Sequence, residues 1–352
     1  MDSRIGVEKP DARCGPSCGG RVVAVVAAVA GLACAVAYSD LVSAVAFATF
    51  APRSRAGADV APRPACTDLD ALGRGTWNNA TEEWEPRACA RQQLTRALLE
   101  RCLAGARIGF YGDSTLRRVV AELSRLVEVN FKLASWAPAP HYVGGGNFGN
   151  GTRAAMFWTP SAYHQKPANV GTFASDDVAI ISIGVWDMGQ YYRGVNAWHE
   201  SMKSILMRAL ERRPGKPVFV VNLHKMYATR CSLVRDTEEG RKNLELCRQC
   251  NKEEEVTAFR AALVAAYGCV RATPRGANLH LIDPYGLTDS PFAGNRSDGV
   301  HFDPVVTRME LEFMMAAVCQ GLRHPSAKAE NVSCPTGINF EEGKHLSCKG
   351  TL

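Results

Sequence analysis

The sequence predicts an α/β fold in which helices cover both faces of a parallel sheet. From residue 66 onwards, short apolar runs alternate with amphipathic segments, and this alternation is typical of parallel sheets. The run Val178 to Ile183 is apolar throughout, as expected for a strand that is covered on both faces. The chain has 352 residues, of which 46% are hydrophobic and 22% charged. This composition excludes a mainly disordered or collagen-like protein, and the length fits two domains or one large domain with accessory segments.

The expected elements follow one another from Arg107. A strand over Arg107 to Tyr111 precedes a helix over Thr115 to Val127, whose apolar residues share one helical face. The later elements are, in order, strand Val178 to Ile183, helix Asn196 to Arg213, strand Pro217 to Leu223, helix Glu253 to Tyr267, strand Leu279 to Asp283 and helix Pro304 to Gly321. Ligand sites in such sheets lie at the carboxyl ends of strands. We therefore expect the chemistry just after Tyr111, Ile183 and Asp283.

An apolar segment near the N-terminus predicts a membrane anchor. Val22 to Ser39 carry no charge, and residues 41–52 are again uncharged after Asp40; this is close to the shortest stretch that spans a bilayer. We expect a cytosolic tail over 1–21, a transmembrane signal anchor over 22–50, a stem over 51–65 and one domain over 66–352. A cleaved signal peptide and hence a secreted protein is the main alternative, because Ala35-Val36-Ala37 resembles a cleavage site. A buried core helix is the third interpretation.

Cysteines and glycosylation motifs place the large domain in an oxidising lumen. Ten of the 13 cysteines follow the apolar segment, and an even number fits full pairing. Four N-x-S/T sequons lie on the same side, at Asn79, Asn150, Asn295 and Asn331. We expect a single-pass type II protein of the Golgi or ER membrane with a lumenal domain. The net charge of +6 comes without a dense basic block, so no nucleic-acid partner is expected.

Two short motifs at strand ends indicate acyl-transfer chemistry. Gly112-Asp113-Ser114 follows the first strand and opens a helix, where a serine is exposed and its own N–H can stabilise an oxyanion. A plain helix N-cap is the alternative role for Ser114. After the last strand, Asp298 and His301 are spaced so that the carboxylate can orient an imidazole that takes the proton from Ser114. A lone D-x-x-H is common by chance in surface loops, but the two motifs together are more specific.

Further residues carry a family resemblance. The segments Trp84 to Cys89, Cys102-Leu103 and Ile108 to Ser114, followed by Arg117, resemble the PC-esterase group of SGNH proteins. That group includes plant trichome-birefringence-like polysaccharide O-acetyltransferases and the lumenal domain of the sialic acid O-acetyltransferase. The resemblance covers about Cys66 to Val318. It implies a three-layer flavodoxin-like fold with Ser114 as nucleophile, His301 as base and Asp298 as its orienter.

The expected oxyanion hole departs from the general SGNH pattern. Gly184-Val185-Trp186-Asp187 lacks the Asn that SGNH enzymes usually have there and resembles the Gly-x-Trp of the PC-esterase branch. We expect donors from the N–H groups of Ser114 and Gly184, with Asn147 as the candidate third donor. Trp186 is expected to pack in the fold or to stack on a sugar. Arg117 matches the family arginine and is expected to bind substrate or a carboxylate, or to form a salt bridge on the helix.

Two other motifs are interpreted without a cofactor or metal. Gly144 to Gly149 matches G-x-G-x-x-G, but no strand is expected before it and no helix after it, so a loop over the active site is favoured over a dinucleotide site. Cys247-x-x-Cys250, flanked by Cys231 and Cys269, is compatible with a four-cysteine zinc site. In an oxidising lumen, two disulfides among these four cysteines are the favoured interpretation. No metal is expected.

These observations predict a glycan O-acetyltransferase that uses a Ser–His–Asp triad and an acyl-enzyme. The acceptor is expected to be a glycan or polysaccharide. An acetyl donor such as acetyl-CoA is a co-substrate, and no cofactor is bound tightly. A carbohydrate acetyl esterase of the same fold is the first alternative, because water and a sugar hydroxyl compete for the same acyl-enzyme. A catalytically silent glycan-binding protein is the second alternative.

Overall fold

The computed structural model describes residues 66, 72–134, 142–163, 176–189, 191–232, 236–290, 299–323 and 334. The segments predicted as tail, membrane anchor and stem lie outside these residues. Asp298 and the sequons at Asn295 and Asn331 also lie outside them. Within the described part of the chain, no helix has both the length and the apolar character that a membrane crossing needs.

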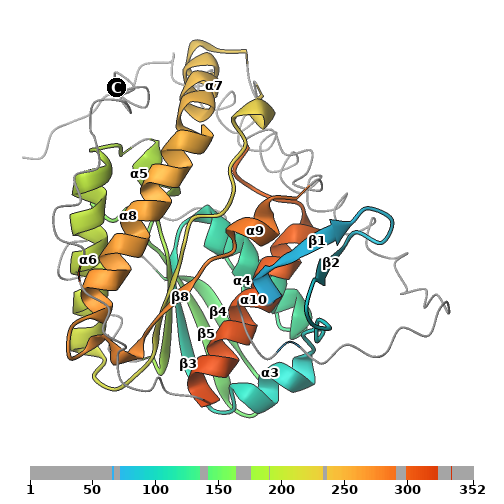
Figure 1. Ribbon diagram of the computed structural model, residues 1–352. Coiled ribbons are helices and arrows are strands. Elements are labelled where there is room, and N and C mark those ends of the chain that lie inside the picture. Colours follow the sequence, from blue (N-terminus) through green and yellow to red (C-terminus); the bar gives the residue numbers. More distant parts are fainter. Residues whose placement is uncertain are drawn as a thin grey trace, which may run out of the picture. The chain divides into compact units, whose positions relative to one another are not determined.

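A central sheet confirms the predicted α/β class. Its six strands lie in the order β4-β5-β3-β6-β7-β8 (Figure 1). Five are parallel, and only the edge strand β4 runs antiparallel to its neighbour. In chain order, the parallel strands therefore have the arrangement 2-1-3-4-5 of flavodoxin-like sheets. The strands are β3 (Arg107–Gly112), β4 (Tyr142–Phe148), β5 (Thr152–Trp158), β6 (Val178–Ser182), β7 (Val218–Val221) and β8 (Leu279–Ile282).

Helices cover both faces of this sheet, as the sequence predicts. α6 (Val195–Arg212) and α8 (Glu253–Arg271) lie side by side on one face, and α4 (Ser114–Leu126) and α10 (Pro304–Arg323) lie on the other (Figure 1). Successive side chains of a strand point to opposite faces, so each strand supplies both cores. Phe110 packs in the core beneath α4 and α10, whereas its neighbour Tyr111 packs in the core beneath α6 and α8.

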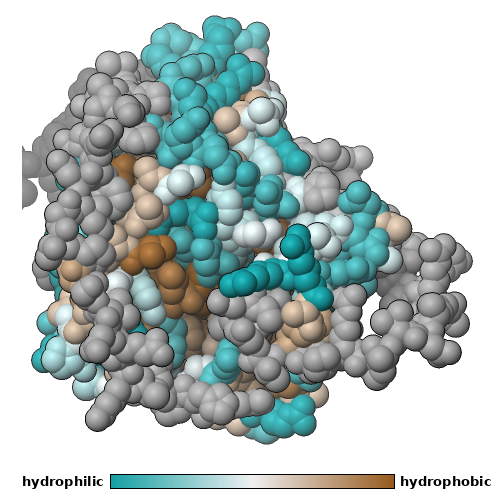
Figure 2. Space-filling view, viewed as in Figure 1, coloured by the Kyte–Doolittle hydropathy of each residue, from teal (hydrophilic) through white to brown (hydrophobic). Residues whose placement is uncertain are grey.

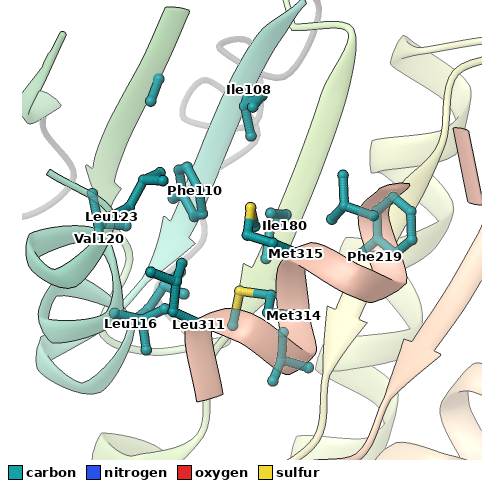
Figure 3. Packing of buried hydrophobic residues seen from close by; sticks show 14 of the residues in the cluster. Ile108, Phe110, Leu116, Val120, Leu123, Ile180, Phe219, Leu311, Met314 and Met315 are labelled. Carbon is teal, nitrogen blue, oxygen red and sulfur yellow. The ribbon is translucent and has the colours of Figure 1, made fainter. Parts of the chain in front are cut away.

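The core beneath α4 and α10 fixes the helix that carries Ser114. Leu116, Val120 and Leu123 of α4 contact the sheet and α10 through buried side chains (Figure 3). Met315 of α10 lies against the same sheet face near Ile180 (Figure 3). Each fully buried side chain of this size contributes about 1.5–3 kcal/mol. The apolar stripe of α4 thereby holds the N-terminus of this helix at the carboxyl end of β3.

The sheet is surrounded by accessory elements, and the sequence analysis did not predict these elements. Trp84, in a hairpin strand, is buried and donates from Nε1 to the Leu72 carbonyl at 2.8 Å. A charged helix buries only Cys250 and forms the hydrophilic surface at the top of Figure 2. These elements are β1 (Gly75–Asn78), β2 (Glu83–Pro86), α3 (Arg96–Cys102), α5 (Val185–Met188), the charged α7 (Glu238–Cys250), α9 (Tyr285–Thr288), and the 3-10 turns η2 (Ala228–Arg230) and η3 (Gly276–Asn278).

The glycine-rich segment corrects the predicted loop over the active site. Residues up to Phe148 form the edge strand β4, in which Gly145 lies opposite Ala155 of β5. A Cβ at Gly145 would lie 2.2 Å from the Ala154 carbonyl oxygen, and one at Gly146 would lie 2.5 Å from the Phe131 ring. Close packing therefore requires the glycines here. Since a run of glycines shows no apolar alternation, nothing in the local sequence indicated a strand.

Four disulfides pair eight of the ten expected cysteines: Cys66–Cys89, Cys102–Cys319, Cys231–Cys247 and Cys269–Cys334. The expectation of two bonds among Cys231, Cys247, Cys250 and Cys269 is wrong, because Cys269 instead pairs with Cys334. In the described part of the chain Cys250 is a buried free thiol, and Cys348 lies outside that part. Full pairing of the ten cysteines stays a prediction.

The sequons that the structure describes occupy turns. Asn79 lies in the turn between β1 and β2, and Asn150 lies in the turn between β4 and β5. Both side chains are exposed. Their glycosylation stays a prediction.

Among the four described disulfides, the bond between α3 and α10 closes the longest loop, because Cys102 and Cys319 are 217 positions apart. We expect the double variant Cys102→Ala/Cys319→Ala to lose about 2–4 kcal/mol of unfolding free energy, because a crosslink stabilises mainly by restricting the unfolded chain. The matched control is Cys231→Ala/Cys247→Ala, whose cysteines are 16 residues apart. Loop length predicts a smaller loss there. Denaturant unfolding of both variants measures the difference, and an equal or larger loss in the control would contradict the expectation.

Candidate active site

Ser114 and His301 meet at the carboxyl end of the sheet. Ser114 is the first residue of α4, two residues after the end of β3, and His301 lies in the last loop before α10. The His301 Nε2 atom is 2.8 Å from the Ser114 Oγ atom, although 187 residues separate the two in the chain. Both side chains are partly exposed. A hydroxyl within hydrogen-bond distance of an imidazole is the arrangement of a nucleophile and its general base.

Asp113, not Ser114, caps the helix. The Asp113 Oδ1 atom accepts hydrogen bonds from the Thr115 backbone N–H at 2.9 Å and from the Thr115 hydroxyl at 2.7 Å. The N-cap role considered for Ser114 is therefore wrong, and the Ser114 hydroxyl faces His301 instead. The first N–H groups of a helix have no intrahelical acceptor. The Ser114 N–H is one of these, so it is suited to receive an oxyanion.

Gly184 stands beside this turn. It follows the end of β6, whose last residue, Ser182, pairs with Gly112 of β3. Gly184 thus lies beyond the paired strand residues, at the point where the strand order reverses and where flavodoxin-like folds bind ligands. Its φ of +139° favours glycine, and a Cβ here would lie 2.8 Å from the Leu223 side chain. Gly184 stays the second expected oxyanion donor.

Asn147 is excluded as an oxyanion donor. It lies opposite Arg153 of β5, which in turn lies opposite Arg107 at the start of β3. Ser114 follows the other end of β3, five residues further along the strand at Gly112. At about 3.3 Å per residue, the two positions are roughly 16 Å apart along the sheet. The antiparallel direction of β4 sends Asn147 to the edge away from the site.

Arg117 lies on the helix that Ser114 opens, and Trp186 lies two residues after Gly184. Trp186, on α5, is partly exposed; its ring stacks on Tyr191 with centroids 6.0 Å apart and meets Trp158 edge-on at 6.2 Å. Arg117 lies one turn after Ser114 on α4 and donates from Nη1 to the Ala134 carbonyl at 3.3 Å. Both stay candidates for substrate contact, and the orienting role of Asp298 stays a prediction.

Asp187 is a site residue that the sequence analysis missed. It is fully buried on α5 and accepts hydrogen bonds from the Ser161 hydroxyl, from the Ala162 N–H at 2.9 Å and from Trp198 Nε1 at 3.2 Å. Burial raises its pKa to about 7, and these hydrogen bonds offset only part of that effect. Asp187 thus ties the segment after β5 to the turn after β6 that holds Gly184. A charged residue directly after Gly-x-Trp was the available signal.

A second buried carboxylate belongs to the helix cap. Burial raises the pKa of Asp113, whereas its hydrogen bonds from Thr115 and the nearby charges of His224 and His301 lower it. The side chain is only 1% exposed. Perturbed carboxyl groups gather at functional sites more often than elsewhere. Asp113 and Asp187 are thus two buried acids with raised pKa values at the sheet edge that carries Ser114 and His301.

Comparisons with known proteins found similar solved structures but no match in sequence. No family model matches the chain, and no curated protein matches it in sequence. Similar solved structures include a carbohydrate esterase family 3 protein from Talaromyces cellulolyticus (13% identity, TM-score 0.40, covering 62% of this chain and 98% of that one) and a lipase/acylhydrolase from Enterococcus faecalis (12%, 0.35, 64% and 99%). An acetyl esterase mutant with an acetate ion is a third (12%, 0.41, 63% and 100%). Because the identities and TM-scores are low, the functional argument rests on the geometry of the site.

The raised pKa of Asp187 has a measurable effect on stability. The folded protein keeps this proton up to about pH 7, whereas an unfolded chain releases it near pH 4. The folded state therefore binds more protons between these values, and its stability falls as pH rises through this window. We expect the wild-type protein to lose unfolding free energy relative to the Asp187→Asn variant between about pH 4 and pH 7. The expected loss is of the order of a few kcal/mol. Denaturant unfolding at several pH values measures this, and a pH-independent difference would contradict it.

Proposed function

We propose that this chain is an SGNH-type serine acyltransferase that moves an acetyl group onto a sugar hydroxyl. The 2.8 Å contact between Ser114 Oγ and His301 Nε2 is the observation that carries the proposal. The position of this pair supports it, because the carboxyl edge between β3 and β6 is where flavodoxin-like sheets bind ligands.

In this mechanism His301 Nε2 takes the Ser114 proton while Oγ attacks the carbonyl carbon of an acetyl donor. The N–H groups of Ser114 and Gly184 stabilise the resulting oxyanion. Collapse of this intermediate breaks the bond to the donor, whose leaving atom takes the proton from His301. The acetyl group is then bound to Ser114 as an ester. His301 next takes the proton of the acceptor hydroxyl, whose oxygen attacks the carbonyl carbon of the ester. The bond from this carbon to Ser114 Oγ then breaks, and Ser114 Oγ takes the proton back from His301. Asp298 orients the imidazole in both steps.

The aromatic cluster beside the site supports a glycan as the acceptor. Trp186 and Tyr191 present stacked, partly exposed rings next to the turn that holds Gly184. Flat aromatic faces suit the apolar faces of sugar rings. An acetyl donor such as acetyl-CoA acts as a co-substrate in this proposal. The four disulfides support an oxidising compartment. We propose that the domain lies in the lumen of the Golgi or ER on a type II anchor, with secretion as the alternative.

Hydrolysis of acetyl esters on glycans is the second candidate function. Ser114 and His301 are both partly exposed, so water can reach an acetyl group bound to Ser114. Transferase and esterase activity then differ only in which hydroxyl reaches the acyl-enzyme first. A catalytically silent glycan-binding protein is disfavoured, because binding alone does not require the Ser114–His301 contact.

Ser114→Ala tests the proposed function directly. We expect it to abolish labelling by a fluorophosphonate probe and to lower acyl transfer by at least about 10⁴-fold, since the attacking oxygen is lost. His301→Ala should act similarly, and the double variant should be about as inactive as either single one. Ser204→Ala on α6, across the sheet from α4, is the matched control and should behave as wild type. Retained labelling in a folded Ser114→Ala protein would refute the mechanism.

Trp186→Ala tests the sugar-stacking role. Loss of one aromatic contact is worth about 0.5–1.5 kcal/mol, so we expect the KM for the glycan acceptor to rise up to about tenfold. Trp186→Phe should keep most of the affinity, because it retains a ring. Steady-state kinetics with acceptor as the varied substrate separates KM from kcat. A fall in kcat with unchanged KM would instead assign Trp186 to packing around Gly184.

A further inference from the structure

A small cavity lies behind Ser114, between α4, α10 and the carboxyl ends of β6 and β7. Its lining includes four polar side chains that the mechanism above does not use: Asp113, Asn222, His224 and Glu310. They are 1%, 2%, 7% and 7% exposed, respectively. Such buried polar groups need hydrogen-bond partners. Neither Ser114 nor His301 is among the lining residues, whereas Asp113 and Thr115, the chain neighbours of Ser114, are.

Three polar atoms of these side chains lack a hydrogen-bond partner among the described residues: Asp113 Oδ2, Asn222 Nδ2 and His224 Nε2. Leaving each of them unpaired costs about 1–3 kcal/mol. Asp113 Oδ2 needs a donor and Asn222 Nδ2 needs an acceptor. The cavity has room for about one water molecule. Water satisfies both needs, because it donates and accepts at the same time.

Two neighbours, Glu310 and Phe302, orient the His224 ring in this cavity. Its Nδ1 atom lies 3.3 Å from Glu310 Oε1. Glu310 from α10 and Asp113 from α4 are thus two carboxylates that line one cavity with a single imidazole. An imidazole has a nitrogen on each side of the ring, so His224 can face Glu310 through Nδ1 and donate to a water through Nε2. The edge of the His224 ring also packs against Phe302, with centroids 4.8 Å apart, which fixes its plane.

We propose that the cavity holds an ordered water bonded to Asp113 Oδ2, Asn222 Nδ2 and His224 Nε2, and that His224, held by Glu310, acts through it as a positioning residue for Asp113. Asp113 in turn caps α4 and sets the turn that carries Ser114. The proposal rests on the proposed function only in taking Ser114 as the nucleophile. The water itself is independent of that function.

The variants His224→Leu and His224→Gln test the positioning role. We expect His224→Leu to lower the rate of fluorophosphonate labelling of Ser114 by roughly tenfold, because the water loses the hydrogen bond that His224 donates and Asp113 is held less firmly. His224→Gln should recover most of that rate, because its amide N–H can donate to the same water. Equal losses in the two variants would assign His224 to packing alone, and an unchanged rate in His224→Leu would overturn its positioning role.

A high-resolution crystal structure of the wild-type protein tests the water without any activity. We expect a water within hydrogen-bond distance of Asp113 Oδ2, Asn222 Nδ2 and His224 Nε2. An empty cavity would overturn the proposal, whether or not the variants fold. If the proposed function is wrong instead, the wild-type protein will show no labelling by the fluorophosphonate probe, but the water will still be present in the crystal structure.

Discussion

The carboxylate of Asp113 is the interaction on which the site depends. By accepting both hydrogen bonds from Thr115, it caps α4 from the position before Ser114 and frees the serine hydroxyl for His301. The turn is this tight because Gly112 has no side chain: a Cβ there would lie 2.3 Å from the Ser182 carbonyl oxygen. β3 and β6 can therefore end side by side. The nucleophile and the turn with Gly184 consequently emerge at one edge of the sheet.

Most of the framework could be predicted, because its strands and helices have strong local patterns. The apolar run from Val178 is β6, and the amphipathic segment from Thr115 is α4, each within one residue of the predicted start. Ser114 and His301 could be paired in advance because the carboxyl ends of parallel strands share an edge. The three glycines of β4 carry no such pattern, so neither this strand nor the distant position of Asn147 could be inferred. The contact of His224 with Glu310 depends on packing between a strand end and α10, which local sequence does not encode.

Burial of acids is the cost of this arrangement. Asp113, Asp187 and Glu310 are each at most 7% exposed, and burial raises the pKa of the first two. Taking a carboxylate out of water destabilises the fold unless hydrogen bonds or opposite charges compensate. Two of these acids hold backbone segments in place, at Thr115 and at Ala162. The buried acids that destabilise the fold are thus the ones that hold the backbone around the site in a fixed geometry.

The Cys102–Cys319 disulfide has a consequence for the covalent connectivity of the catalytic pair. Ser114 follows Cys102 by 12 residues, and His301 precedes Cys319 by 18 residues, so the path through the sulfur bridge is about 30 residues instead of 187 along the backbone. Chain statistics make closure of the shorter path cheaper by roughly 1.6 kcal/mol. Before any packing forms, the bridge therefore raises the effective concentration of the imidazole at the serine by roughly fifteenfold. The oxidised chain behaves as a tether that keeps the two reacting groups within reach of each other.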